Sequence, residues 1–125
     1  MERDTHSVIV IGGITMRFLV DGEVTDGHMA MAEMVVQPQA KVPPAHLHDG
    51  VDETIRVLEG ALTYRVDDEV RVLRPGDHCF SPRGSVHHFS NQGEVPARAI
   101  VVFSPASIGP AYFRDVAGVL GAGGP

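Results

Sequence analysis

The sequence predicts an all-β domain, built as a sandwich or barrel of short strands. Glycine and proline interrupt the chain at short intervals, with 14 glycines and 9 prolines in 125 residues. The segments between them are short and rich in valine, isoleucine and other apolar residues. Such spacing is typical of antiparallel sheets, whereas βαβ units need a long helical segment between successive strands.

The expected strands fill the segments between these turns. Alternation is clearest in residues 61–66, where Leu62, Tyr64 and Val66 share one face of a strand. By the same reasoning we place strands at residues 8–11, 17–20, 28–37, 45–48, 54–58, 61–66, 70–73, 79–81, 87–91 and 98–104.

One helix is expected, near the end of the chain. It spans about residues 110–120, because Pro110 suits a first helical turn and the apolar residues that follow share one face. On that face Tyr112 and Phe113 are placed to cap the mouth of a barrel. The glycine-rich tail, residues 121–125, is expected to be disordered. We therefore predict a single domain over residues 1–125 with its core at about 8–104, a size that supports one hydrophobic core.

The composition argues against several classes of partner. The net charge is −6 and the ten lysines and arginines are scattered, so no basic patch for nucleic acid is visible. No apolar stretch approaches the length of a membrane span. The single cysteine, Cys79, excludes an intramolecular disulfide and favours a reducing compartment. Because the first residues also lack the features of a signal peptide, we expect a cytoplasmic protein.

Two histidine-containing segments carry the candidate chemistry. In the first, His46 and His48 are two residues apart, so on a strand they present two imidazoles to the same side. Asp49 and Gly50 form a turn that can bring Glu53 back to that side from the next strand. Two histidines and a carboxylate on a rigid sheet suit a divalent transition metal.

The second segment could add a third nitrogen. Residues 82–84, with the sequence Pro-Arg-Gly, form a turn that starts a strand, and His87 opens that strand. Strand alternation then points His88 to the opposite side. Local spacing alone leaves a second interpretation open, because isolated pairs of surface histidines are commoner than metal sites.

The two segments together resemble the two sequence motifs of the cupin superfamily. The first motif is HxH, followed after four residues by Glu and after six more residues by Gly. The second motif begins with Gly and continues, at fixed distances, with Pro-x-Gly, His and Asn. The matching residues are His46, His48, Glu53, Gly60, Gly76, Pro82, Gly84, His87 and Asn91. One position departs from the pattern, because Ala40 stands where the first motif usually opens with Gly.

The cupin resemblance implies a fold and a metal site. The fold is a double-stranded β-helix, or jelly-roll barrel, with a short C-terminal helix. One divalent transition metal ion per chain would be held inside one end of the barrel by His46, His48, Glu53 and His87. With no thiolate in that set, Fe, Mn, Ni, Co and Cu are candidates and Zn is possible. Small cupins also pair through a sheet edge or face, which implies a homodimer.

A looser resemblance, over most of the chain, is to small quercetin-dioxygenase-like cupins. It is carried by residues 25–27, 43–48 and 57–60 and by the segment from Pro105 to Phe113. It implies an oxidoreductase acting on a small enolic or phenolic substrate, with Glu53 as the catalytic base. Two alternatives stay open: an isomerase or polyketide-type cyclase that uses the metal only as a Lewis acid, and a small-ligand-binding module without turnover.

Neighbouring residues have simpler expected roles. Phe89 shares the inward face of its strand with His87 and is expected to line the pocket. Asp52 should point away from the metal, and Asn91 should bind turn backbone. The sequence does not settle whether His78 faces the pocket.

Overall fold

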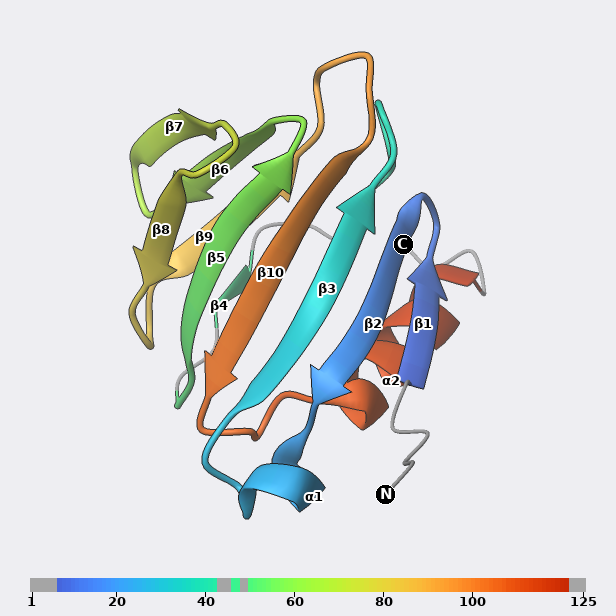
Figure 1. Cartoon of the computed structure of the whole chain (residues 1–125), viewed down its shortest axis with the longest axis vertical. Helices are drawn as coiled ribbons and strands as arrows, with labels where there is room; N and C mark the ends of the chain where they lie inside the picture. Colours follow the sequence, from blue (N-terminus) through green and yellow to red (C-terminus); the bar gives the residue numbers. More distant parts are fainter. Residues whose placement is uncertain (1–6, 43–45, 48–49, 122–125) are drawn as a thin grey trace.

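The computed structural model of the chain has two antiparallel β-sheets that face each other (Figure 1). It describes residues 7–42, 46–47 and 50–121, and gives only the backbone for residues 7, 46–47 and 119–121. The expected all-β architecture with a C-terminal helix is confirmed.

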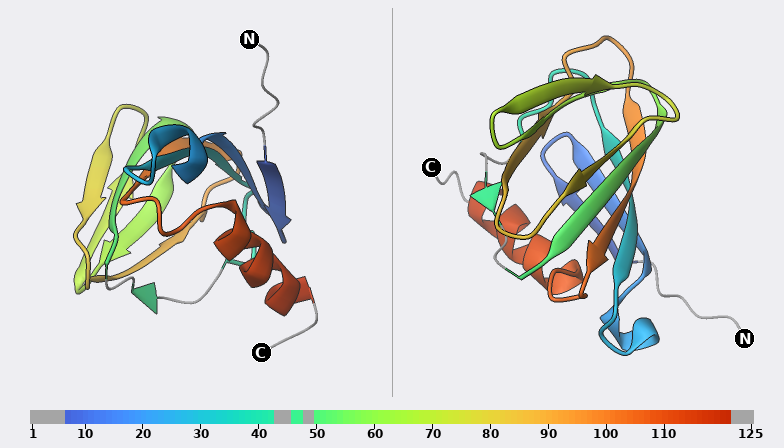
Figure 2. Two further views of the ribbon diagram at one scale, coloured as in Figure 1. Left: turned by 90° about the horizontal axis from the view of Figure 1, so that it is seen from below. Right: turned by 90° about the vertical axis from the view of Figure 1, so that its left-hand side faces the viewer.

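The larger sheet has six strands and the smaller sheet has four. The two sheets face each other, as Figure 2 shows from two directions. The larger sheet runs in the order β1 (Ser7–Ile11), β2 (Ile14–Val20), β3 (Ala30–Val36), β10 (Ala97–Ser104), β5 (Asp52–Glu59) and β8 (His78–Ser81). The smaller sheet runs in the order β4 (His46–Leu47), β9 (Val86–Ser90), β6 (Leu62–Val66) and β7 (Glu69–Leu73).

Strand alternation builds the core, because successive side chains point to opposite faces of a sheet. In β3 every second residue is buried, and β10 repeats this pattern beside it. The alternation predicted for β6 is also present, with Leu62 and Tyr64 buried. The inward residues of β3 and β10 are Ala30, Ala32, Met34, Val36, Ala97, Ala99, Val101 and Phe103.

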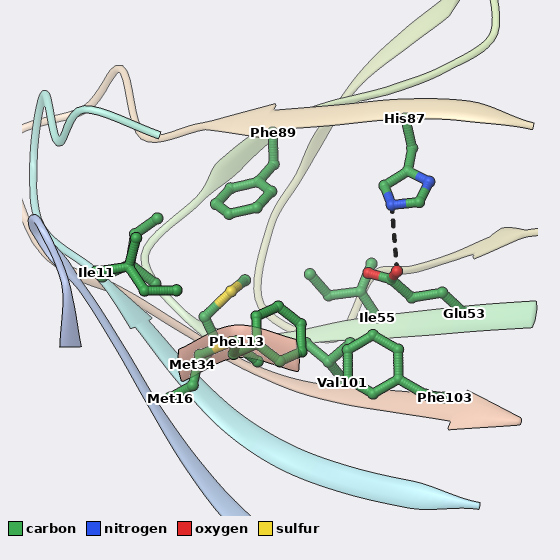
Figure 3. A pocket seen from close by; sticks show the side chains of 11 residues that line it. Ile11, Met16, Met34, Glu53, Ile55, His87, Phe89, Val101, Phe103 and Phe113 are labelled. Carbon is green, nitrogen blue, oxygen red and sulfur yellow. Dashed lines mark ion pairs between the residues drawn. The ribbon is translucent and has the colours of Figure 1, made fainter. Parts of the chain in front are cut away.

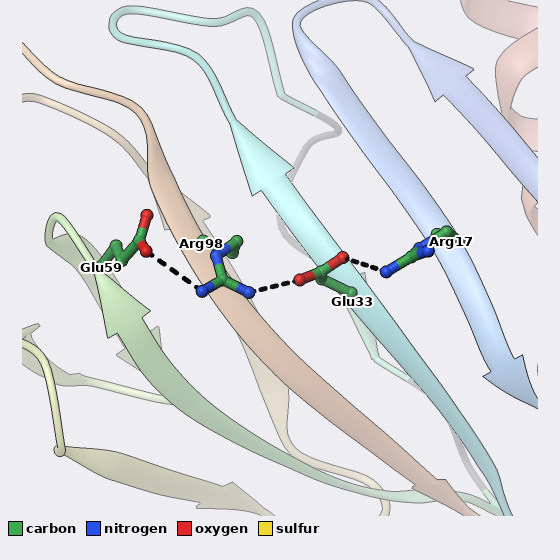
Figure 4. A network of polar contacts seen from close by, with 4 residues as sticks. All are labelled: Arg17, Glu33, Glu59 and Arg98. Atoms are coloured by element: carbon green, nitrogen blue, oxygen red, sulfur yellow. Dashed lines mark hydrogen bonds and ion pairs between the residues drawn. The ribbon is translucent and has the colours of Figure 1, made fainter.

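A row of charges crosses the outer face of the larger sheet (Figure 4). Glu33 on β3 accepts hydrogen bonds from Arg17 on β2, at 2.9 Å, and from Arg98 on β10. Arg98 also donates to Glu59 on β5, at 3.1 Å. The two guanidinium groups hold the pKa of Glu33 below its usual value, chiefly through the Arg98 hydrogen bond. The row therefore links four neighbouring strands on the side opposite the core.

The predicted strands are present, and several of them begin or end at other residues than expected. β2 begins at Ile14, earlier than the expected residue 17, because Ile14 pairs with Val36 across the β2–β3 ladder. β3 begins later than the expected residue 28, because the Thr25 hydroxyl donates to the Met29 carbonyl at 2.6 Å and holds that segment in a turn. Of the strand expected at residues 45–48, the described residues His46 and Leu47 form β4.

The structure has one helix that the sequence did not predict. The short helix α1 (Gly22–Thr25) is capped by Asp21, whose carboxylate accepts hydrogen bonds from the backbone amides of Glu23 and Val24. The helix α2 (Pro110–Gly121) matches the predicted one, except that Gly121 belongs to it and not to the expected tail. The rest of that tail, residues 122–125, lies outside the described residues. Neither described helix is long and apolar enough to cross a membrane.

Candidate metal centre

Glu53 and His87 meet between the two sheets. Glu53 lies near the start of β5 in the larger sheet, and His87 lies on β9 in the smaller one. Glu53 Oε1 is 3.2 Å from His87 Nε2, and their side chains are 12% and 5% exposed. Figure 3 shows the two side chains reaching toward each other from opposite walls of a pocket. The structure thus brings together two of the residues that the sequence motifs single out.

The backbone of His46 lies beside that of His87. β4 and β9 pair antiparallel, with His46 directly opposite His87 in the register. The side chain of His46 and all of His48 lie outside the described residues, so the structure does not test these two expected ligands.

The separation of the Glu53 and His87 donor atoms suits two neighbouring ligands of one cation. Metal–ligand bonds of about 2.1 Å at right angles place two donor atoms about 3.0 Å apart. The observed 3.2 Å is close to that value. Among the described side chains, no group of three or more His, Cys, Asp or Glu residues could hold a metal ion. His87 and Glu53 supply one nitrogen and one oxygen donor of the expected set, and His46 and His48 stay predicted ligands.

Tyr64 supports the ring of His87. Their rings are stacked, with centroids 6.5 Å apart and planes 4° from parallel. The Tyr64 hydroxyl forms a hydrogen bond of 3.1 Å with Ser81 Oγ, which fixes the far end of the ring. Burial raises the pKa of Tyr64, so the phenol stays protonated and uncharged. The sequence pattern placed Tyr64 on the same face of its strand as Leu62 and Val66 but gave no sign that it contacts His87.

Asp52 and Arg83 join the strand of Glu53 to the turn that precedes His87. The Asp52 carboxylate accepts hydrogen bonds from the Arg83 backbone amide at 2.8 Å and from its guanidinium at 3.2 and 3.1 Å. The guanidinium, and then the backbone amide, lowers the pKa of Asp52. Asp52 therefore faces Arg83 and helps to position the two strands.

Asn91 has the structural role that the sequence suggested. Its Nδ2 donates to the carbonyls of Val36 and Val95, both at 2.9 Å, and its Oδ1 accepts from the Gly93 amide at 2.9 Å. The side chain is buried and binds backbone on both sides of the turn. This motif residue serves the loop and not the metal centre.

A narrow, mostly apolar pocket adjoins Glu53 and His87. Its volume is about 40 Å³, room for roughly three water molecules. Phe89 lines it, as predicted, and Phe113 of α2 reaches it, whereas Tyr112 is exposed and lies outside the lining. His78 is exposed and pairs with exposed Arg56, so it does not face the pocket.

Comparison with known proteins identifies the family. The family model for the cupin domain matches residues 32–103, which include both histidine segments. The chain belongs to the cupin family.

Two relatives with different names each match most of this chain. Germin-like protein 1 of Brassica napus is 31% identical over 107 residues, covering 81% of this chain and 51% of that protein. The tetracenomycin polyketide synthase protein TcmJ of Streptomyces glaucescens is 33% identical over 96 residues, covering 75% of this chain and 62% of that protein. The chain thus spans about half to three fifths of the length of these two relatives.

A solved structure supports the same fold. A protein of Thermotoga maritima, described as a predicted oxalate decarboxylase, superposes with a TM-score of 0.74 at 20% identity, over 83% of this chain and 96% of that one. At that identity the similarity establishes the fold alone. The matches define a cupin without selecting the quercetin-dioxygenase-like group within the family.

Proposed function

We propose that the chain is a metal-dependent oxidoreductase of the quercetinase-like cupin type, acting with dioxygen on a small enolic or phenolic substrate. The proposed ligands of one divalent transition ion are His46, His48, Glu53 and His87. The observation that carries the proposal is the 3.2 Å approach of Glu53 Oε1 to His87 Nε2 at one end of an apolar pocket.

The donor set favours Fe, Mn, Ni, Co or Cu, with Zn possible, because it offers nitrogen and oxygen and no thiolate. Cys79 is buried, and burial raises the pKa of its thiol. A neutral thiol is a poor ligand, so we leave Cys79 out of the set.

The proposed chemistry is activation of a substrate hydroxyl group. A divalent ion bound there would supply Lewis-acid character and lower the pKa of that hydroxyl. Glu53 is the proposed base, because its carboxylate lies at the pocket end and is 12% exposed. His87 would keep its ring orientation through the stacked ring of Tyr64. The apolar side chains that line the rest of the pocket would limit the entry of water.

The second candidate is non-oxidative: an isomerase or polyketide-type cyclase at the same site. The 33% identity to TcmJ, named as a polyketide synthase protein, favours this candidate. The same residues would bind the ion and move the proton, but no dioxygen would be consumed.

The test begins with metal content. Protein from cells supplied with mixed metals should carry close to one transition-metal ion per chain by elemental analysis. His87→Ala should lose most of it. His88→Ala is the matched control, because His88 is half-buried on the opposite face of the same strand. A chain that takes up no iron, nickel, manganese, copper, cobalt or zinc would refute the proposal.

The second step separates the candidates. Oxygen uptake is measured with a panel of small phenols and enols, in air and under nitrogen. Turnover that requires air supports the oxidoreductase, and equal turnover under nitrogen supports the isomerase or cyclase. Tight ligand binding with no product in either gas would indicate a binding module.

A further inference from the structure

The outer face of the larger sheet is more apolar than the solvent-facing side of a sheet usually is. When an antiparallel sheet covers a core with one face, the residues that point outward are normally polar. The two central strands, β3 and β10, alternate between buried and outward residues, yet most of their outward side chains are apolar. These apolar outward residues are Met31, Val35, Ile100 and Val102, all half-buried. Met31 pairs with Val102 across the two strands, and Ile100 follows Val102 on the same face.

Exposed apolar side chains extend this face to both edges of the sheet. On β1, Val8 and Val10 are 54% and 61% exposed, and on β8, Phe80 is 53% exposed. No helix of the described residues lies over the face, which is turned toward the viewer in Figure 1. The helix α2 packs on the opposite side, where Phe113 contacts the inward ring of Phe103. An exposed apolar face that spans a whole sheet is typical of a protein interaction surface.

The row of charges that crosses this face alternates in sign. From β2 to β5 the order is positive, negative, positive, negative, through Arg17, Glu33, Arg98 and Glu59 (Figure 4). The two ends are the more exposed members, because the side chains of Arg17 and Glu59 are 44% and 65% exposed, against 17% for Glu33 and 37% for Arg98. The ends therefore remain open to a charged group from outside the chain.

An alternating row of four charges is complementary to a second copy of itself. Two copies that pack face to face are related by a two-fold axis that lies in the interface. If that axis runs perpendicular to the row, between Glu33 and Arg98, the rotation reverses the row. Arg17 then faces Glu59 of the second copy, and Glu33 faces Arg98 of the second copy. An axis along the row would instead put each charge against its own counterpart, which like-charge repulsion disfavours.

We propose that the outer face of the larger sheet is the contact surface of a homodimer, in which Arg17 of each copy pairs with Glu59 of the other. The apolar side chains of the face supply most of the affinity, and the charges fix the orientation of the two copies. This inference does not depend on the proposed function, because it uses no residue of the candidate metal centre.

The first test locates the surface by sedimentation velocity at micromolar concentration, where the wild type should be a dimer. Ile100→Asp should weaken the dimer at least about tenfold, because each dimer would bury two unpaired carboxylates. Val72→Asp is the matched control, because Val72 is 45% exposed on β7 of the smaller sheet. It should leave the dimer unchanged, and circular dichroism should show that both variants are folded.

The second test uses exposed charges, so it does not depend on a substitution in the apolar face. Arg17→Glu brings two carboxylates together at each end of the interface, and Glu59→Arg brings two guanidinium groups together. Each variant alone should dimerise at least about tenfold more weakly than the wild type, because the change acts twice in a symmetric dimer. Mixing the two variants restores opposite charges at both ends. Native mass spectrometry should therefore show well over the half share of heterodimer that random pairing gives.

The mixing experiment separates this interface from effects within one chain. Each substitution also disturbs the row in its own copy, but that disturbance is the same in homodimers and heterodimers. Heterodimer at only the random share would overturn the proposed pairing of Arg17 with Glu59. A wild-type monomer would overturn the proposal, and so would a folded Ile100→Asp variant that dimerises as tightly as the wild type, because the contact surface would then lie elsewhere.

Discussion

Gly60, between β5 and β6, occupies a position where a side chain meets two separate penalties. Its φ is +72°, in the left-handed region. A Cβ added there would lie 2.5 Å from the Pro96 carbonyl oxygen and 2.8 Å from Ala97 Cα. Both neighbours are backbone atoms at the start of β10, so neither can move without shifting the strand. This geometry explains why a glycine stands at that place of the first motif.

Gly60→Ala should therefore lower the free energy of unfolding by the sum of both effects. The left-handed conformation costs a residue with a Cβ about 1–2 kcal/mol. Forcing an extra carbon against fixed backbone costs about 1–3 kcal/mol. The expected loss is about 2–5 kcal/mol, a large part of the roughly 5–15 kcal/mol that stabilises a domain.

The measurement is urea unfolding followed by circular dichroism, on chelator-treated protein so that bound metal does not add to stability. Gly76→Ala is the matched control. Its φ is +92°, but an added Cβ would meet nothing within 4 Å. The free energy of unfolding of this variant should fall only by the cost of the left-handed conformation, about 1–2 kcal/mol. Equal losses in the two variants would show that close approach of β10 to Gly60 contributes nothing.

Three further predictions concern the site and the assembly. Glu53→Gln keeps the size of the side chain and one oxygen donor but loses its basicity. The metal content should therefore persist while turnover falls roughly 10²–10⁴-fold. A full rate with bound metal would mean that Glu53 acts only as a ligand. The pKa of Asp52 is lower in the folded state, so its pairing with Arg83 stabilises the fold above about pH 4 and is lost as the pH falls through the lower folded value. Arg83→Gln should flatten this part of an acid-unfolding curve, and an unchanged curve would contradict the role of the pair. We also expect a homodimer, because edge strands β1 and β7 carry exposed valines; a monomer by light scattering at micromolar concentration would count against it.

Local patterns were enough to predict most of the strands. Period-two alternation placed Tyr64 on the same face as Leu62, and both are buried. It also put Phe89 on the same face as His87, and both line the pocket. The turn pattern at residues 82–84 correctly predicted that a strand containing His87 follows it. The helix α1 was missed because it has one turn and lacks an apolar face, so its only sequence signal is the capping residue Asp21.

The metal ligands remain a prediction of the sequence motifs, and the structure contributes their surroundings. It places the backbone of His46 opposite His87, residues 41 positions apart in the chain, through the β4–β9 pairing. It also joins Glu53 and His87 from different sheets. Spacing along the chain could not give that distance, because it depends on how two sheets face each other.

The sequence by itself predicted the candidate metal ligands and which side chains of a strand share a face, because motif spacing, periodicity and turn residues are local properties of the chain. Only the tertiary structure decided that Tyr64 stacks on His87, that Asp52 binds Arg83, and that Phe113 enters the pocket. These contacts join segments far apart in the chain. They depend on strand order and on the position of α2, which result from packing the whole core at once.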